Sequence, residues 1–259
     1  MCLIAIAWQA RRDLPLMVAA NRDEWRERPT KAAHWWPERA DLLAGRDLQA
    51  GGTWMGITRG GRFAAVTNFR DPSDKRSTAR SRGTLVTEFL FGNDTPARFL
   101  ANLSPRAHEY NGFNIVVGDG ASLFYFGSRE GQPRAIEPGV HAISNHLLDE
   151  PWPKVVAGKI AMNQALDDRD PVGILFDMLS DEGRPPDDEL PSTGVGLEWE
   201  RRLGAALITG KDYGTRASTV LAITNHGEAI FEERTRAPDG AVTQTVREAF
   251  TVEAVTAAG

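Results

Sequence analysis

Two long apolar runs near the start of the chain constrain the fold more than any other feature of the sequence. They cover residues 2–8 (CLIAIAW) and 14–20 (LPLMVAA), and the charged residues Arg11, Arg12 and Asp13 lie between them. Continuous apolar runs of this length are typical of strands that are buried on both faces. A chain of 259 residues is long enough to bury a thick core. The sequence therefore predicts central strands with a further layer on each side.

Three hairpins are predicted further along the chain, each with a glycine-containing turn between two short strands. They cover residues 54–67, 113–126 and 218–233. The turns are expected at Gly60-Gly61, Asp119-Gly120 and Asn225-His226-Gly227.

Four helices are predicted between these strands. Thr95-Pro96 and Asp170-Pro171 each combine an N-cap residue with a proline at the first helical position. Residues 84–91 and 153–166 are also expected to be helical. The order of strands, helices and strands again indicates an α+β fold with helices packed outside the sheets.

The chain shows no internal repeat and no clear domain boundary, so a single domain is expected over residues 1–259. The acidic segment at 180–197 is interrupted by prolines and is expected to be a surface loop.

Composition excludes several classes of protein. The 30 Lys and Arg residues are outnumbered by 35 acidic residues, and a net charge of −5 does not fit a nucleic-acid binder. A single cysteine rules out an intramolecular disulfide and fits a reducing compartment. The first apolar run is too short to span a membrane and lacks the flanking residues of a signal peptide. We therefore expect a cytoplasmic protein with no membrane span and no nucleic-acid partner.

Several enzyme motifs are absent from the sequence. There is no G-x-S-x-G elbow and no H-E-x-x-H pair, and the glycines of GAALITGK at 204–211 are not spaced as in a P-loop. The five histidines lack the spacing of metal ligands. We therefore expect no metal site and no required cofactor.

Polar residues gather where the predicted strands end. These residues are Asn21, Arg22, Asp23, Glu24, Asn68, Asn145 and Arg216. Each cluster by itself fits ordinary turn chemistry or a surface ion pair. All of them occur, however, in a chain whose sole cysteine is Cys2, and together they indicate a candidate site.

These motifs resemble the NRDE family, also called the transport and Golgi organisation family. The resemblance rests on MC at the start, NRDE at 21–24, GGTWMG, TNFRDP, YNGFN at 110–114, GVHAISNH and TRASTVL, and it spans nearly the whole chain. Proteins of this family are similar to N-terminal nucleophile (Ntn) hydrolases, especially the branch with bile-salt hydrolases and penicillin V acylases. The resemblance implies a four-layer αββα sandwich.

The resemblance also implies that Cys2 is a nucleophile once Met1 has been removed. The freed α-amine has a pKa near 7.7–8.0 in model peptides, so its neutral form could act as the base for the thiol of the same residue. Arg22 is the candidate cation that stabilises the thiolate, and Asp23 is the candidate that orients the amine.

Further roles are carried over to residues of other strands. The side-chain amides of Asn68 and Asn145 are candidates to stabilise the negative charge that develops on the carbonyl oxygen during attack. Arg216 would complete the charge balance or position the substrate.

The assignment within NRDE stays open at this point. Side chains alternate between the two faces of a strand, so the adjacent Arg22 and Asp23 are not both expected to face one site without a bend. Asn21 and Glu24 are alternatives for these roles, and we expect them to contact the substrate together with Trp54.

Two functions follow from the resemblance. The first is a cysteine hydrolase that acts on a nonpeptide C–N (amide) bond. The second is a non-catalytic carrier on the same scaffold, because members of the family are linked to haem trafficking and to lipid or acyl-CoA metabolism. The expected ligand is thus a small-molecule amide, a lipid or haem as bound cargo. Five tryptophans could line an apolar pocket, but they could equally pack in the core and on the surface. They are Trp8, Trp25, Trp35, Trp36 and Trp54. In a third interpretation Cys2 is simply a small buried hydrophobic residue.

Overall fold

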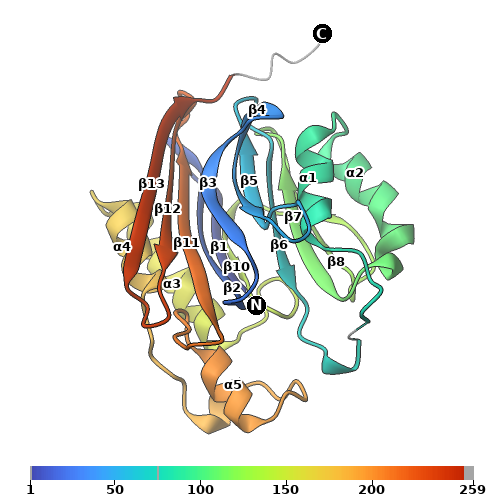
Figure 1. Ribbon diagram of the computed structural model, residues 1–259. Coiled ribbons are helices and arrows are strands. Elements are labelled where there is room, and N and C mark those ends of the chain that lie inside the picture. The colour runs from blue at the N-terminus through green and yellow to red at the C-terminus, as the bar shows by residue number, and fades with distance from the viewer. Residues whose placement is uncertain (1, 75, 254–259) are drawn as a thin grey trace.

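A computed structural model of the protein describes residues 2–74 and 76–253, with the side chains of all these residues except Cys2. Within them two antiparallel sheets stack face to face, and helices cover both outer faces (Figure 1). This four-layer αββα sandwich confirms the expected fold class.

The first sheet contains six strands in the described part of the chain, in the order β10-β1-β2-β11-β12-β13. These are β1 (Cys2–Arg11), β2 (Leu14–Trp25), β10 (Gly139–Ile143), β11 (Tyr213–Ile223), β12 (Glu228–Arg236) and β13 (Val242–Thr251). The two apolar runs form β1 and β2, which pair with the backbone of Cys2 opposite Arg22. β11 lies on the other side of β2, so β2 is an internal strand.

The second sheet contains seven strands in the same described residues, and their order in space follows their order in sequence. These are β3 (Thr30–Trp36), β4 (Arg39–Asp47), β5 (Met55–Thr58), β6 (Phe63–Asn68), β7 (Phe113–Gly118), β8 (Leu123–Gly127) and β9 (Arg134–Ala135). Two predicted hairpins form β5–β6 and β7–β8, and β11–β12 forms the third. Gly61 and Gly120 have positive φ angles of 79° and 86° in two of these turns, a conformation that other residues rarely adopt.

The four predicted helices are all present. They are α1 (Gly83–Phe91), α2 (Pro96–Leu103), α3 (Pro153–Asp167) and α4 (Pro171–Leu179). A fifth helix, α5 (Leu197–Gly204), was not predicted, and 3-10 turns lie at Pro72–Asp74, Ser104–Glu109 and Asp187–Glu189. The side chains of Thr95 and Asp170 cap α2 and α4 by accepting bonds from the amides of Arg98 and Gly173. Among residues 2–74 and 76–253, no helix is long and apolar enough to span a membrane. Most side chains between residues 180 and 197 are exposed, and α5 follows them.

The alternation of side chains along β2 explains why its sequence is continuously apolar. Leu16, Val18 and Ala20 are buried between the two sheets, whereas Met17 and Ala19 are buried against α3 and α4. A third core lies between the second sheet and the helices α1 and α2. A strand with a core on each face needs apolar residues at every position, which is the pattern of residues 14–20.

Candidate active site

A cavity of about 390 Å³ opens at the ends of β2 and β6. The predicted site residues that line it are Arg22, Asp23, Glu24, Trp54 and Asn68. The backbone of Cys2 pairs with Arg22 of this wall, but the thiol itself lies outside the described part of the structure. The structure thus brings most of the predicted residues to one place, next to the start of β1.

Arg22 and Asp23 point to opposite faces of β2, as strand alternation requires. The guanidinium of Arg22 faces the second sheet, where it stacks 4.3 Å from the ring centroid of Trp54 and donates to Oγ1 of Thr30 at 3.2 Å. The carboxylate of Asp23 accepts a hydrogen bond of 2.7 Å from Thr215 of the neighbouring β11. Both side chains are buried because β2 is internal and covered on both faces.

The environment of Asp23 makes its protonation state sensitive to nearby cations. Burial raises the pKa of this carboxyl group, while the positive charges of Lys154 and Arg70 act in the opposite direction. The hydroxyl of Thr215 that donates to Asp23 also accepts a hydrogen bond of 2.9 Å from the amide of Ile208. Asp23 is therefore held in a fixed orientation, with its ionised form dependent on positive charge beside it.

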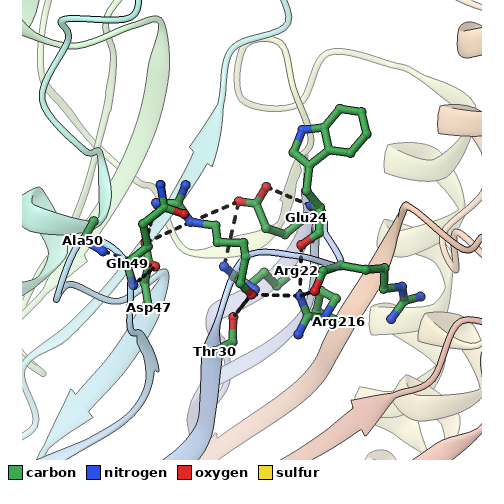
Figure 2. Close-up of polar contacts among 10 residues, drawn as sticks. Arg22, Glu24, Thr30, Asp47, Gln49, Ala50 and Arg216 are labelled. Carbon is green, nitrogen blue, oxygen red and sulfur yellow. Dashed lines mark hydrogen bonds and ion pairs between the residues drawn. The ribbon is translucent and has the colours of Figure 1, made fainter.

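Charged groups on the face of β2 that carries Arg22 form a continuous network, which Figure 2 shows. The carboxylate of Glu24 lies 3.8 Å from guanidinium nitrogens of both Arg22 and Arg28. Arg28 also contacts Asp47 at 2.6 Å, and Asp47 accepts bonds from the backbone amides of residues 49 and 50. The network fixes the position of Glu24 in the cavity wall and leaves its carboxylate close to Arg22.

Trp54 has space for its ring because residue 45 is glycine. A Cβ atom at Gly45 would lie 2.2 Å from the indole of Trp54, well inside contact distance. Trp54 is the one member of the predicted tryptophan set that lines the cavity. Trp8 and Trp36 are buried in the cores, Trp35 packs against the core between the sheets, and Trp25 is 45% exposed.

The two predicted amides lie together but are placed differently. Asn68 ends β6 and lines the cavity, whereas the buried Asn145 donates from Nδ2 to the backbone carbonyl of Asn68 at 2.9 Å. Asn114 holds the chain neighbours of both residues. Its amide donates to Oγ1 of Thr67, next to Asn68, at 3.1 Å and to the carbonyl of His146, next to Asn145, at 2.8 Å. Asn145 therefore holds the end of the strand that carries Asn68.

Two further predicted residues, like Asn145, lie outside the cavity wall. Asn21 donates at 2.8 Å to the carbonyls of both Leu179 and Ala206, which links β2 to the helical layer. Arg216 lies in a β-bulge of β11 opposite Arg22 and Asp23. Its guanidinium donates to three carbonyls, those of Trp25 at the end of β2 and of Arg26 and Arg28 just after it. These contacts fix the backbone around the NRDE segment.

Comparison with known proteins gives the family of this chain. A sequence model of the Transport and Golgi organisation 2 family matches residues 1–238. The chain belongs to this family. It is 37% identical over 239 residues to the Transport and Golgi organization protein 2 homolog of Bos taurus. It is 35% identical over 237 residues to the homolog of Homo sapiens. Each comparison covers 85% of this chain and 86% of the relative.

The fold of this family member is shared with Ntn hydrolases. The structure of a Caenorhabditis elegans ortholog of N-acylethanolamine-hydrolyzing acid amidase is similar, with a TM-score of 0.50. The likeness covers 85% of this chain and 92% of that chain at 10% sequence identity, so it concerns the fold alone. Family membership and fold confirm the resemblance that the sequence motifs indicated.

Several residues of the family member's cavity were not predicted from its sequence. They include Arg28, Asp47, Thr53, Arg82 and Asn111. Thr53 lies within the GGTWMG motif and Asn111 within YNGFN, and both motifs were usable signals. Arg28, Asp47 and Arg82 lie in ordinary polar segments. In the described ranges, no group of three His, Cys, Asp or Glu side chains is placed to hold a metal ion.

Proposed function

We propose that this protein is an Ntn-type cysteine hydrolase that cleaves a nonpeptide C–N (amide) bond, with Cys2 as nucleophile after removal of Met1. One observation carries the proposal. Arg22, Asp23 and Asn68 line a single cavity, and the backbone of Cys2 pairs with Arg22 at its edge. The Ntn fold supports the same proposal.

In the first step the neutral α-amine of Cys2 takes the thiol proton. Arg22 supplies a fixed positive charge that favours the thiolate over the thiol. Burial raises the pKa of Asp23, so its carboxylate is stabilised when a cation such as the protonated amine lies beside it. In this mechanism Asp23 and the amine thus stabilise each other's charged forms.

In the second step the thiolate sulfur attacks the carbonyl carbon of the amide, and the π electrons move to oxygen. The amide of Asn68 lies in the cavity wall, and we assign to it the hydrogen bond to this oxyanion. The C–N bond then breaks, the α-amine returns its proton to the leaving nitrogen, and a thioester remains on Cys2. Water hydrolyses this thioester to a carboxylic acid and restores the thiol.

Asn145 is assigned a positioning role in this mechanism, because its amide already donates to the carbonyl of Asn68. Arg216 is assigned a similar role through the carbonyls that it binds at the end of β2 and just after it. Loss of a direct oxyanion donor typically costs about 3 kcal/mol of transition-state stabilisation. Asn68→Ala should therefore lower turnover about 100-fold or more, while binding of the substrate changes little.

The experiment that tests the proposal is intact-mass analysis, followed by trapping with an electrophilic amide analogue. Cys2 is the sole cysteine, so a single adduct on sulfur reports this position. We expect the mature protein to lack Met1 and to form one adduct, and Cys2→Ala to form none while its circular dichroism spectrum is unchanged. Retained Met1 and no adduct would contradict the hydrolase proposal.

A second function is favoured by the names of the relatives, which refer to transport and Golgi organisation rather than to hydrolysis. We propose as the alternative a non-catalytic carrier of haem or of a lipid such as an acyl-CoA, located in the cytoplasm. A spectral titration with haem distinguishes the two proposals. A carrier should bind haem with the same affinity before and after Cys2→Ala, and it should show no turnover of amides.

A further inference from the structure

Arg70 is a buried arginine to which the mechanism above gives no role. It follows Asn68, the proposed oxyanion donor, by two residues. Its backbone amide donates a hydrogen bond of 2.7 Å to the carbonyl of Asn145. The side chain of Asn145 in turn donates to the carbonyl of Asn68 at 2.9 Å. Asn145 is therefore bound to both residue 68 and residue 70, and a shift of Arg70 would move the end of β6.

The guanidinium of Arg70 is held by two elements far away in the sequence. Its Nη1 atom lies 2.5 Å from Oε2 of Glu200 in α5, and both side chains of this ion pair are buried. Its Cζ atom lies 4.7 Å from the ring centroid of Trp152, the N-cap residue of α3. The side chain thus joins the end of β6 to α5 and to the start of α3.

Glu200 is itself fixed, so it can serve as an anchor for Arg70. Its second oxygen, Oε1, accepts hydrogen bonds from the backbone amide of Thr193 at 2.8 Å and from the hydroxyl of the same residue at 2.6 Å. Further along α5, the carbonyl of Leu203 accepts a bond of 2.9 Å from the buried Lys154 of α3. These contacts attach α5 to its surroundings and keep Glu200 beside Arg70.

A buried ion pair is an inefficient way to stabilise a fold, because removal of both charges from water can cost as much as their attraction returns. It is an efficient way to fix a position, since a guanidinium and a carboxylate bind in few relative orientations. The pair also acts on the site electrostatically. Burial raises the pKa of Asp23, and the positive charge of Arg70 opposes this rise.

We propose that Arg70, held by Glu200, is a positioning residue of the hydrolase, and that it fixes the end of β6 so that the amide of Asn68 meets the oxyanion. This inference rests on the proposed function. An oxyanion donor is effective only within a narrow range of distances, and a displacement of about 1 Å can lower a rate about 100-fold. Loss of Arg70 should therefore slow attack on a carbonyl and leave other reactions of the thiol unchanged.

Two reactions of Cys2 separate this role from a general loss of structure. In acylation by p-nitrophenyl acetate the sulfur attacks the carbonyl carbon, an oxyanion forms, and p-nitrophenolate leaves with the electrons of the broken C–O bond. In alkylation by iodoacetamide the sulfur displaces iodide from a saturated carbon, and no oxyanion forms. In both reactions the thiol proton passes to the α-amine. The readout is the rate of acylation divided by the rate of alkylation.

Both rates can be measured at this position because Cys2 is the sole cysteine. Absorbance follows the burst of p-nitrophenolate, corrected for the rate with Cys2→Ala, and intact mass follows alkylation. Arg70→Gln should lower the ratio about ten-fold, Glu200→Gln about three-fold and Asn68→Ala about 100-fold.

A double variant tests whether Arg70 acts through Asn68. The ratio in Asn68→Ala combined with Arg70→Gln should be no lower than in Asn68→Ala alone, because no amide is left to position. A further fall in the double variant overturns the proposal, and so does an unchanged ratio in Arg70→Gln.

Arg201→Gln and Glu198→Gln are the matched controls. The two residues form a surface ion pair with each other in α5 and do not line the cavity, so the ratio should not change. If Arg70→Gln and Glu200→Gln do not fold, the pair is replaced together by Arg70→Met and Glu200→Leu. Apolar residues of similar volume often preserve the stability that a buried ion pair provides. A folded protein with both replacements and the ratio of the wild type overturns the proposal.

Failure of the hydrolase proposal gives a different result. If the wild type shows no burst of p-nitrophenolate, or if Asn68→Ala leaves the ratio unchanged, Cys2 and Asn68 do not form the proposed site, and the role of Arg70 falls with it. If Asn68→Ala lowers the ratio and Arg70→Gln does not, the hydrolase proposal stands and only the positioning role is overturned.

Discussion

Replacing Glu233 by glutamine should make the stability of the protein less dependent on pH. Glu233 lies in β12 with only 2% of its surface exposed. Its carboxylate accepts a hydrogen bond of 2.7 Å from the amide of Ala33, and Thr219 lies at hydrogen-bond distance on the other side. Burial raises the pKa of Glu233 from 4.5 to about 7, although the amide of Ala33 and the charge of Arg22 oppose this rise.

The size of the effect follows from this pKa. The unfolded chain loses the proton near pH 4.5, whereas the folded protein keeps it to about pH 7. Between these values the unfolded state binds fewer protons, so the free energy of unfolding falls as pH rises. The raised pKa of Glu233 corresponds to about 3 kcal/mol, present in full below pH 4.5 and lost above pH 7.

Urea unfolding at pH 5 and pH 8 measures this difference. The wild type should lose about 2–3 kcal/mol more between these two pH values than Glu233→Gln does, because glutamine has no proton to release. Glu232→Gln is the control, since Glu232 is also buried but lies against Arg234 and Arg247. That variant controls for the loss of a buried carboxylate from the same strand.

Two results would refute this reasoning. One is a pH dependence in Glu233→Gln equal to that of the wild type, which would mean that Glu233 ionises as easily in the folded protein as in the unfolded chain. The other is a wild type that becomes more stable between pH 5 and pH 8 relative to this variant. In that case charge attraction, chiefly from Arg22, would outweigh burial.

Three further substitutions test other contacts, each by urea unfolding at pH 7. Glu200→Gln should cost about 3 kcal/mol, because it removes the charged partner of Arg70 and both side chains are buried. Gly45→Ala should cost about 1–3 kcal/mol, since the new methyl group would lie 2.2 Å from Trp54 and the indole must move. Thr95→Ala should cost about 1 kcal/mol, because it removes the side-chain cap of α2.

Controls are available for these variants. Glu198→Gln removes an equal charge two residues before Glu200 in the same helix, but the side chain of Glu198 is 84% exposed. The free energy of unfolding should change by less than about 0.5 kcal/mol. An equal loss in Glu198→Gln and Glu200→Gln would contradict the role given to the buried pair. Unchanged stability in Gly45→Ala or Thr95→Ala would contradict the close contact or the cap.

Much of the fold was predictable because its signals are local. The apolar run at 14–20 and the caps Thr95 and Asp170 specify structure within a few residues, and these elements form where predicted. The strands β3 and β4 were missed since their sequences, TKAAHWW and RADLLAGRD, mix polar and apolar residues without clear alternation. Their burial depends on the first sheet, which packs against them.

The candidate site was predictable as a set of residues but not as an arrangement. Motifs placed Arg22, Asp23 and Asn68 near one another, and these residues line one cavity. The sequence did not show that Asn145 contacts the carbonyl of Asn68 or that Arg216 binds the carbonyl of Trp25 at the end of β2. Such contacts depend on strand register and on the bulge in β11, which join residues far apart in the chain.

The sequence by itself determined the buried strands, the hairpin turns and the helix starts, because each depends on the chemistry of neighbouring residues. The tertiary structure decided which charges meet. Asp23 and Thr215 form their hydrogen bond across 192 positions of sequence, and Arg82 reaches the cavity only because α1 begins beside it. Contacts over such separations depend on how the layers pack, and local sequence patterns do not contain that information.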